Sequence, residues 1–267
     1  MITTKKGLLI SLIIPTYRQE KTIAKDIKRI QSVMEQLRYP YEMIVIVDGM
    51  LDNTYRNAVK HQGKNVKVYA YPKNLGKGFA VRFGMLKANG DIVGFIDAGM
   101  DIHPNGLSML LEHFEWYNAD IIVGSKLHPV SKVHYPLSRK ILSMGYRLLV
   151  KLFFGLSIRD TQVGMKFYKK KVIENVLPRL LVKRYAFDIE ILAVAYRLGY
   201  KRIFEAPIEL DFKESSITTT NFWKVVLHML WDTFAVFYRL NILHYYDGKS
   251  RKWKKLSDPS MALLKKE

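Results

Sequence analysis

Two carboxylates, Asp97 and Asp101, follow a short apolar run at residues 92–96. This run is long enough for one buried strand and too short for a helix. In an open α/β sheet, ligands bind outside the carboxyl ends of the strands, and Mg²⁺ or Mn²⁺ is usually held by few carboxylates together with substrate phosphates. The pair therefore predicts a site for a divalent cation and a phosphorylated ligand. From this stretch alone, an alternative stays open in which Asp97 caps the next turn and Asp101 is solvated.

Apolar runs and helical patterns alternate along the first half of the chain. We expect strands at residues 8–14, 41–47, 66–71, 92–96 and 120–124, and helices at 21–37, 54–61, 79–88 and 105–117. This alternation predicts βαβ units, and hence an α/β fold with a mostly parallel central sheet flanked by helices. Right-handed crossovers then place the turns that follow the early strands on one edge of the sheet.

Polar or glycine-containing turns follow each of the first four expected strands. They comprise residues 16–20, 48–49, 73–78 and 97–101. Their convergence favours the metal site and makes a nucleotide the natural ligand of this edge. The turn Asn74-Leu-Gly-Lys-Gly78 contains two glycines and a lysine, but it matches neither the phosphate-binding G-x-x-x-x-G-K-[ST] pattern nor the dinucleotide pattern G-x-G-x-x-G. A dinucleotide cofactor is therefore not expected, and an ordinary turn before a helix remains the alternative.

The composition limits the classes of partner and chemistry. The 267 residues include 43 Lys and Arg against 24 Asp and Glu, a net charge of +19. This excess favours a polyanionic partner, which could be nucleic acid, an anionic membrane surface or a phosphorylated substrate. The chain has no cysteine, which excludes disulfides, thiolate nucleophiles and cysteine-based zinc sites.

Two segments of the second half have amphipathic helical patterns. In residues 136–155, Lys140, Arg147 and Lys151 share one stripe, and in residues 221–245 a narrow polar stripe leaves a broad surface of Trp, Phe and Leu. Such helices suit the plane of a membrane interface. The basic cluster that follows them, at residues 249–255, suits anionic lipid. Burial against the domain or in a homodimer is the alternative. We expect no transmembrane helix and no nucleic-acid partner, because neither an 18-residue apolar stretch nor a nucleic-acid module is present.

Several sequence blocks resemble a known family in their order. Ile14-Pro-Thr-Tyr-x-x-Glu20, Val47-Asp-Gly-x-x-Asp52, Asn74-x-Gly-Lys-Gly78 and Asp97-Ala-Gly-x-Asp101 resemble glycosyltransferase family two, with its A-type nucleotide-sugar fold. Ser138-Arg139-Lys140, Arg159-Asp-Thr-Gln-x-Gly-x-Lys-Phe167 and Ala186-Phe-Asp-Ile-Glu-Ile-Leu192 are similar to the dolichyl-phosphate glucose and mannose synthase branch, the glucose type more closely. The likeness covers residues 8 to 215.

The resemblance implies roles for individual residues. Those that hold the base and ribose of the donor would be Pro15, Tyr17, Glu20 and Asp48. The family's Asp-x-Asp metal motif falls on Asp97 and Gly99, and Gly99 cannot ligate. We therefore expect Asp97 and Asp101 to share the ion.

Other residues would act on the leaving group and the acceptor. Lys77 and the metal would stabilise the diphosphate, and Arg139 would clamp an acceptor phosphate through bidentate hydrogen bonds. The analogy places Asp160 beside the donor sugar as orienter or base. Asp188 and Glu190 lie two residues apart on a helix and so on different faces, and we assign Asp188 to the pocket. Without the analogy, Arg139 would be solvated and Asp160 a turn residue.

These expectations combine into one function. Residues 1–215 would form a nucleotide-sugar glycosyltransferase domain, and residues 216–267 an amphipathic helix with a basic tail. The domain would transfer a hexose with inversion, glucose from UDP-glucose being the first choice, to a polyprenyl or dolichyl phosphate in glycan or cell-envelope synthesis. The enzyme would be cytoplasmic and peripheral on the inner face of the membrane. Transfer to a sugar or lipid hydroxyl, or an inactive nucleotide-binding scaffold at the membrane, is the alternative.

Overall fold

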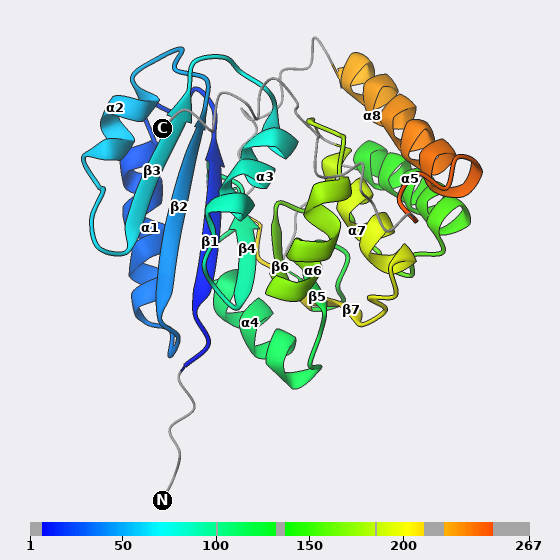
Figure 1. Ribbon diagram of the computed structural model, residues 1–267, viewed down its shortest axis with the longest axis horizontal. Coiled ribbons are helices and arrows are strands. Elements are labelled where there is room, and N and C mark those ends of the chain that lie inside the picture. The colour runs from blue at the N-terminus through cyan, green and yellow to red at the C-terminus, as the bar shows by residue number, and fades with distance from the viewer. Residues whose placement is uncertain (1–6, 100, 132–136, 185, 211–221, 248–267) are drawn as a thin grey trace, which may run out of the picture.

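The computed structural model describes residues 7–99, 101–131, 137–184, 186–210 and 222–247 (Figure 1). Within these ranges, seven strands form one sheet in the order β3-β2-β1-β4-β6-β5-β7. The strands are β1 (Ile10–Thr16), β2 (Tyr41–Asp48), β3 (Val66–Tyr71), β4 (Ile92–Ile96), β5 (Ile121–Ser125), β6 (Met165–Lys169) and β7 (Ile203–Pro207). Strand β6 is antiparallel to β4 and β5, and the other pairings are parallel. The predicted α/β fold with a mostly parallel sheet is confirmed.

Helices lie between and beyond the strands. They are α1 (Ile23–Glu35), α2 (Thr54–Val59), α3 (Lys77–Lys87), α4 (Gly106–Trp116), α5 (Leu137–Phe154), α6 (Lys170–Val176), the 3₁₀ turn η1 (Leu177–Arg179), α7 (Phe187–Arg197), α8 (Phe222–Phe237) and the π-helical turn η4 (Tyr238–Ile242). Helix α1 illustrates why they form, because Ile23, Ile27, Ile30 and Met34 recur on one face and are all buried.

The five expected strands are all present, two of them with the predicted bounds and the others shifted by one or two residues. Short segments rich in apolar and β-branched residues identify them, although single polar residues such as Glu42 in β2 and Lys67 in β3 stand among the apolar ones. Strands β6 and β7 were not predicted. The pairing of β6 with β4 needs Gly94, since a Cβ there would lie 2.1 Å from a ring carbon of Phe167.

Helices α5 and α8 lie side by side at the end of the molecule remote from β3 (Figure 1). The Phe153 ring contacts the rings of Phe234 and Phe237, at centroid distances of 5.1 and 4.4 Å. Both predicted amphipathic helices are present, although the second leaves the α-helical form after Phe237. Within the described residues, no helix combines the length and the apolarity that a membrane crossing requires. The basic cluster at residues 249–255 lies outside the described residues.

Candidate active site

The turns after β1, β2, β3 and β4 meet at one edge of the sheet, as predicted. The backbone N–H of Gln19, after β1, donates to Thr54 Oγ1 over 2.7 Å. The N–H of Leu75, after β3, donates to Asp48 Oδ1 over 2.7 Å. Parallel strands end on the same side of the sheet, so these turns lie close enough for hydrogen bonds to join them.

A row of alternating charges lies at the centre of this edge, and we call it the charge row: Asp97, Lys77, Asp188 and Lys166. Lys77 Nζ lies 2.8 Å from Asp97 Oδ2 and 3.4 Å from Asp188 Oδ2. Lys166, fully buried in β6, contacts Asp188 Oδ1 and donates to the Val163 carbonyl over 2.5 Å. The row joins the end of β4 and the starts of α3, α7 and β6.

The two lysines of the charge row experience opposite shifts in pKa. Burial acts against the charge of Lys77, but Asp188 and Asp97 outweigh it and raise its pKa, so this side chain stays cationic. Burial lowers the pKa of Lys166, and the charge of Lys77 adds to that effect while Asp188 opposes it. Lys77 is therefore a permanent cation at the sheet edge.

Asp97 is the most exposed member of the charge row, with 40% of its side chain open to solvent. Its backbone N–H donates to the Gly164 carbonyl over 2.8 Å. A Cβ at position 164 would lie only 1.9 Å from Asp97 Oδ2, so the carboxylate occupies space that only a glycine leaves free. An exposed carboxylate at this edge fits a divalent cation.

Gly99 and Asp101 continue the loop after Asp97. Gly99 has φ of +102°, a backbone conformation that favours glycine and explains its place in the turn. Asp101 is half-buried. Among the described residues, no cluster of three or more His, Cys, Asp or Glu side chains could hold a metal ion. A cation bound by Asp97 and Asp101 would therefore take its remaining ligands from phosphate oxygens and water, as Mg²⁺ commonly does.

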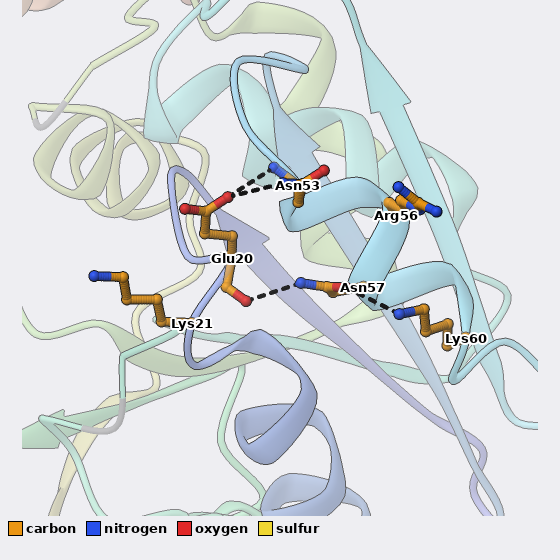
Figure 2. Close-up of a pocket in the computed structure, with 6 residues that line it drawn as sticks. All are labelled: Glu20, Lys21, Asn53, Arg56, Asn57 and Lys60. Carbon is orange, nitrogen blue, oxygen red and sulfur yellow. Dashed lines mark hydrogen bonds between the residues drawn. The ribbon is translucent and has the colours of Figure 1, made fainter.

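The residues expected at the base and ribose lie at the ends of β1 and β2. Pro15 is within β1, and Tyr17 follows it with 44% of its surface exposed. Glu20 accepts hydrogen bonds from Asn53, at 3.1 Å from the backbone and 3.3 Å from the side chain. Glu20 lines an open pocket of about 420 Å³ together with Lys21, Asn53, Arg56, Asn57 and Lys60. Figure 2 shows these six side chains and the hydrogen bonds between Glu20 and Asn53.

Asp48 holds the glycine turn, residues 74–78, in place. Its buried carboxylate accepts hydrogen bonds from the N–H groups of Leu75 and Gly76, over 2.7 and 2.9 Å, and from Asn74 Nδ2 over 3.0 Å. Asp48 therefore fixes the start of α3, and with it the residue that carries the Lys77 cation.

Asp160 lies in the loop between α5 and β6 and is 7% exposed. Its carboxylate accepts the Lys126 N–H over 3.1 Å, and Lys126 Nζ lies 3.7 Å away. The backbone N–H groups of Arg159 and Asp160 both donate to Glu205, on β7. The structure thus places Asp160 at the end of β5 beside a cation. Arg139 belongs to α5, but its side chain lies outside the described part of the structure.

The prediction that Asp188 and Glu190 face different surroundings agrees with their contacts. Asp188 belongs to the charge row, whereas Glu190 binds the N–H groups of residues 181 and 182 and the Tyr246 hydroxyl. Sequence reasoning missed Lys166, and it assigned Glu190 no role. Both occur inside the blocks that carry the family resemblance, which is the signal that could have identified them.

The fold is that of an A-type glycosyltransferase. The family model for Glycosyl transferase family 2 matches residues 11–177. The chain belongs to this family, and the predicted enzyme class is confirmed.

Individual proteins narrow the resemblance to one branch. A dolichyl-phosphate beta-glucosyltransferase of Drosophila melanogaster is 34% identical over 249 residues, which cover 86% of this chain and 76% of that protein. The dolichyl-phosphate beta-glucosyltransferase ALG5D of Trichomonas vaginalis is 30% identical over 262 residues, covering 93% and 79%. The predicted likeness to the glucose type of the branch is confirmed.

A solved structure supports the fold. Glucosyl-3-phosphoglycerate synthase from Mycobacterium tuberculosis, in complex with Mn²⁺, uridine diphosphate and phosphoglyceric acid, matches with a TM-score of 0.65 and 19% identity. The match covers 87% of this chain and 78% of that chain. At this identity it shows the A-type fold alone.

Proposed function

We propose that this protein transfers glucose from UDP-glucose to the phosphate of a polyprenyl or dolichyl phosphate, with the help of Mg²⁺ or Mn²⁺. The observation that carries the proposal is the charge row, in which a partly buried permanent cation, Lys77, meets an exposed carboxylate, Asp97, at the nucleotide-binding edge of the sheet. The names of the relatives in the glucosyltransferase branch support the substrate pair.

On the donor side, Asp97 and Asp101 would hold the metal ion, which supplies charge stabilisation to the diphosphate leaving group. Lys77 lies at the N-terminus of α3 and adds a second positive charge there, where the helix dipole also favours an anion. The residues proposed to hold the base and ribose are Pro15, Tyr17, Glu20 and Asp48.

On the acceptor side, a phosphate monoester is largely ionised near neutral pH because its second pKa is about 6. It needs cations that position it, and Arg139 is proposed for this role. An acceptor oxygen bonds to the anomeric carbon as the bond to the diphosphate oxygen breaks, which inverts the configuration and gives a β-linked product. Asp160 orients the donor sugar in this proposal, and Asp188 holds Lys77.

The acceptor lipid lies in a membrane, so the enzyme needs a surface that contacts the membrane. Helices α5 and α8 are proposed to provide this surface. The exposed side chains of α5, α8 and the η4 turn form what we call the apolar face: Met144, Leu148, Leu152, Leu227, Trp231, Phe234, Tyr238 and Ile242. Spacings of three and four residues put these side chains on common helix faces. We propose that the apolar face lies on the inner face of an anionic membrane, which the net charge of +19 also favours.

An acceptor panel tests the proposal. The protein is incubated with UDP-glucose, Mn²⁺ and either a short polyprenyl phosphate, the matching polyprenol or a free glycan, and products are identified by mass. Glucose on the polyprenyl phosphate alone is expected, whereas transfer to either hydroxyl acceptor would favour the alternative enzyme.

A vesicle assay tests the membrane contact. Sedimentation with vesicles that contain anionic lipid should fall in a Leu152→Glu/Trp231→Glu variant, whose two side chains are 74% and 75% exposed. Unchanged sedimentation, together with a loss of dimer in that variant, would assign the apolar face to a homodimer.

A further inference from the structure

A buried carboxylate, Glu190, joins three distant parts of the chain. It accepts hydrogen bonds from the N–H groups of Leu181, over 3.0 Å, and Val182, over 2.9 Å. It also accepts from the Tyr246 hydroxyl over 2.7 Å and from Arg239 Nη1 over 3.3 Å. We call these five residues the Glu190 cluster. Glu190 itself is fully buried, and a carboxylate in such a place requires donors of this kind.

The loop that Glu190 binds lies directly against the glycine turn. The Lys183 carbonyl accepts the Phe79 N–H over 3.1 Å. A Cβ at Gly76 would lie 2.6 Å from the same carbonyl oxygen, and one at Gly78 would lie 2.9 Å from the Arg184 carbonyl oxygen. The two backbone segments are therefore in contact without intervening side chains.

The glycine turn is thus held from two sides. Asp48 binds it from the sheet, through the N–H groups of Leu75 and Gly76. Loop 181–184 packs on it from the other side, and the Glu190 cluster fixes that loop to η4 and Tyr246. Lys77 begins α3 inside this turn and lies 2.8 Å from Asp97.

We propose that Glu190 and Tyr246 are positioning residues of the donor site. The segment after α8 fixes loop 181–184 against the glycine turn, so that Lys77 is set to receive the diphosphate of the nucleotide sugar. Residues 238–247, which follow α8, then have a part in donor binding as well as in the proposed membrane contact. This inference rests on the proposed function, because it concerns the donor of that reaction.

The same segment has a second attachment, which provides a matched control. Arg197, at the end of α7, forms two hydrogen bonds with Asp247, over 2.9 and 2.6 Å. This ion pair is partly exposed, with side chains 40% and 33% accessible. It fastens the segment to the surface of α7, away from the buried carboxylate that binds loop 181–184.

The experiment compares Tyr246→Phe with Asp247→Asn in the full chain. Tyr246→Phe removes the hydroxyl that donates to Glu190, and Asp247→Asn removes the negative charge that pairs with Arg197. UDP affinity is measured by calorimetry in the presence of Mn²⁺, and kcat and the KM for UDP-glucose by product mass. Loss of a hydrogen bond to a charged group should weaken UDP binding and raise that KM by about tenfold in Tyr246→Phe. Asp247→Asn should change both by less than about twofold, because surface ion pairs contribute little.

Amide exchange supplies a readout that does not depend on activity. The Phe79 N–H, which donates to Lys183, should exchange faster in Tyr246→Phe and at the wild-type rate in Asp247→Asn. Normal UDP affinity and normal Phe79 protection in a folded Tyr246→Phe protein would overturn the inference. So would equal losses in both variants, because these would indicate a general effect on folding.

The failure of the proposed function has a different signature. If the wild-type chain binds no UDP and transfers no glucose, the proposed function fails and the donor role of Tyr246 fails with it. If the wild type does both and Tyr246→Phe matches it, only the inference fails.

Discussion

Replacing Gly164 with alanine should displace the Asp97 carboxylate without unfolding the protein. The added Cβ would lie 1.9 Å from Asp97 Oδ2 and 2.3 Å from Cγ, whereas Cβ contacts shorter than 3.0 Å are essentially never found. The backbones cannot separate easily, since the Asp97 N–H is bonded to the Gly164 carbonyl over 2.8 Å. The side chain is 40% exposed, so it can rotate towards solvent.

The displacement sets the size of the effect. The carboxylate must move by roughly 1 Å, and a misplacement of that size in a catalytic constellation can reduce the rate by about 10²-fold. The move also lengthens the contact between Asp97 and Lys77, which is 2.8 Å in the folded protein. We therefore expect kcat of Gly164→Ala to fall by about two orders of magnitude and its Mn²⁺ affinity to fall as well.

Two measurements check this expectation. Glucose transfer is followed by product mass at saturating UDP-glucose, and Mn²⁺ binding by electron paramagnetic resonance in the presence of UDP. Gly63→Ala is the matched control, because nothing lies within 4 Å of the Cβ it would add. Full activity and full Mn²⁺ affinity in a folded Gly164→Ala protein would refute the role assigned to Asp97.

Four further changes test other parts of the account. Lys77→Met should reduce kcat by about 10²- to 10³-fold, the usual loss for one donor to a developing charge; an unchanged kcat at saturating substrate would remove Lys77 from the leaving-group site. Asp101→Asn should weaken Mn²⁺ binding as measured by resonance, and wild-type affinity would exclude Asp101 as a ligand. Lys166→Met leaves Asp188 with one cation fewer and should lower the free energy of unfolding by about 3 kcal/mol in urea titrations. An unchanged urea concentration at the midpoint of unfolding would contradict a stabilising role for the ion pair of Lys166 with Asp188. Burial alone would raise the pKa of Glu42, but hydrogen bonds from its neighbours lower it below the ordinary 4.5, so the stability it adds is present above pH 4.5 and is lost as the pH falls through the folded pKa. In Glu42→Gln, the free energy of unfolding should fall less steeply than in the wild type as the pH is lowered below 4.5. A fall as steep as that of the wild type would contradict the assignment.

The first half of the fold could be predicted because its signals are local. Strands β3 and β4 have the predicted bounds, since each is a short segment rich in apolar residues between polar or glycine turns. Parallel pairing then required the turns to share an edge, and the contacts of Asp48 with the glycine turn agree with this.

The missed features depend on contacts between distant residues. Strand β6 contains Lys166, a charge that conceals a buried strand in the sequence pattern. Lys166 can be buried only because Asp188 reaches it from α7. Glu190 likewise meets Tyr246, which lies 56 positions further along the chain. No periodicity reveals such pairs. The family blocks did, however, mark the segments that contain Lys166 and Glu190.

We propose that Asp97 and its surroundings support the transfer of glucose to a lipid phosphate. The most direct measurement incubates wild-type protein and Asp97→Asn with UDP-glucose, Mn²⁺ and a short polyprenyl phosphate, and determines the mass and the anomeric configuration of the product. We predict a β-linked glucosyl phosphate lipid from the wild type and none from the variant. Folded wild-type protein that binds UDP but forms no lipid-linked glucose would contradict the account, as would a variant that retains full activity.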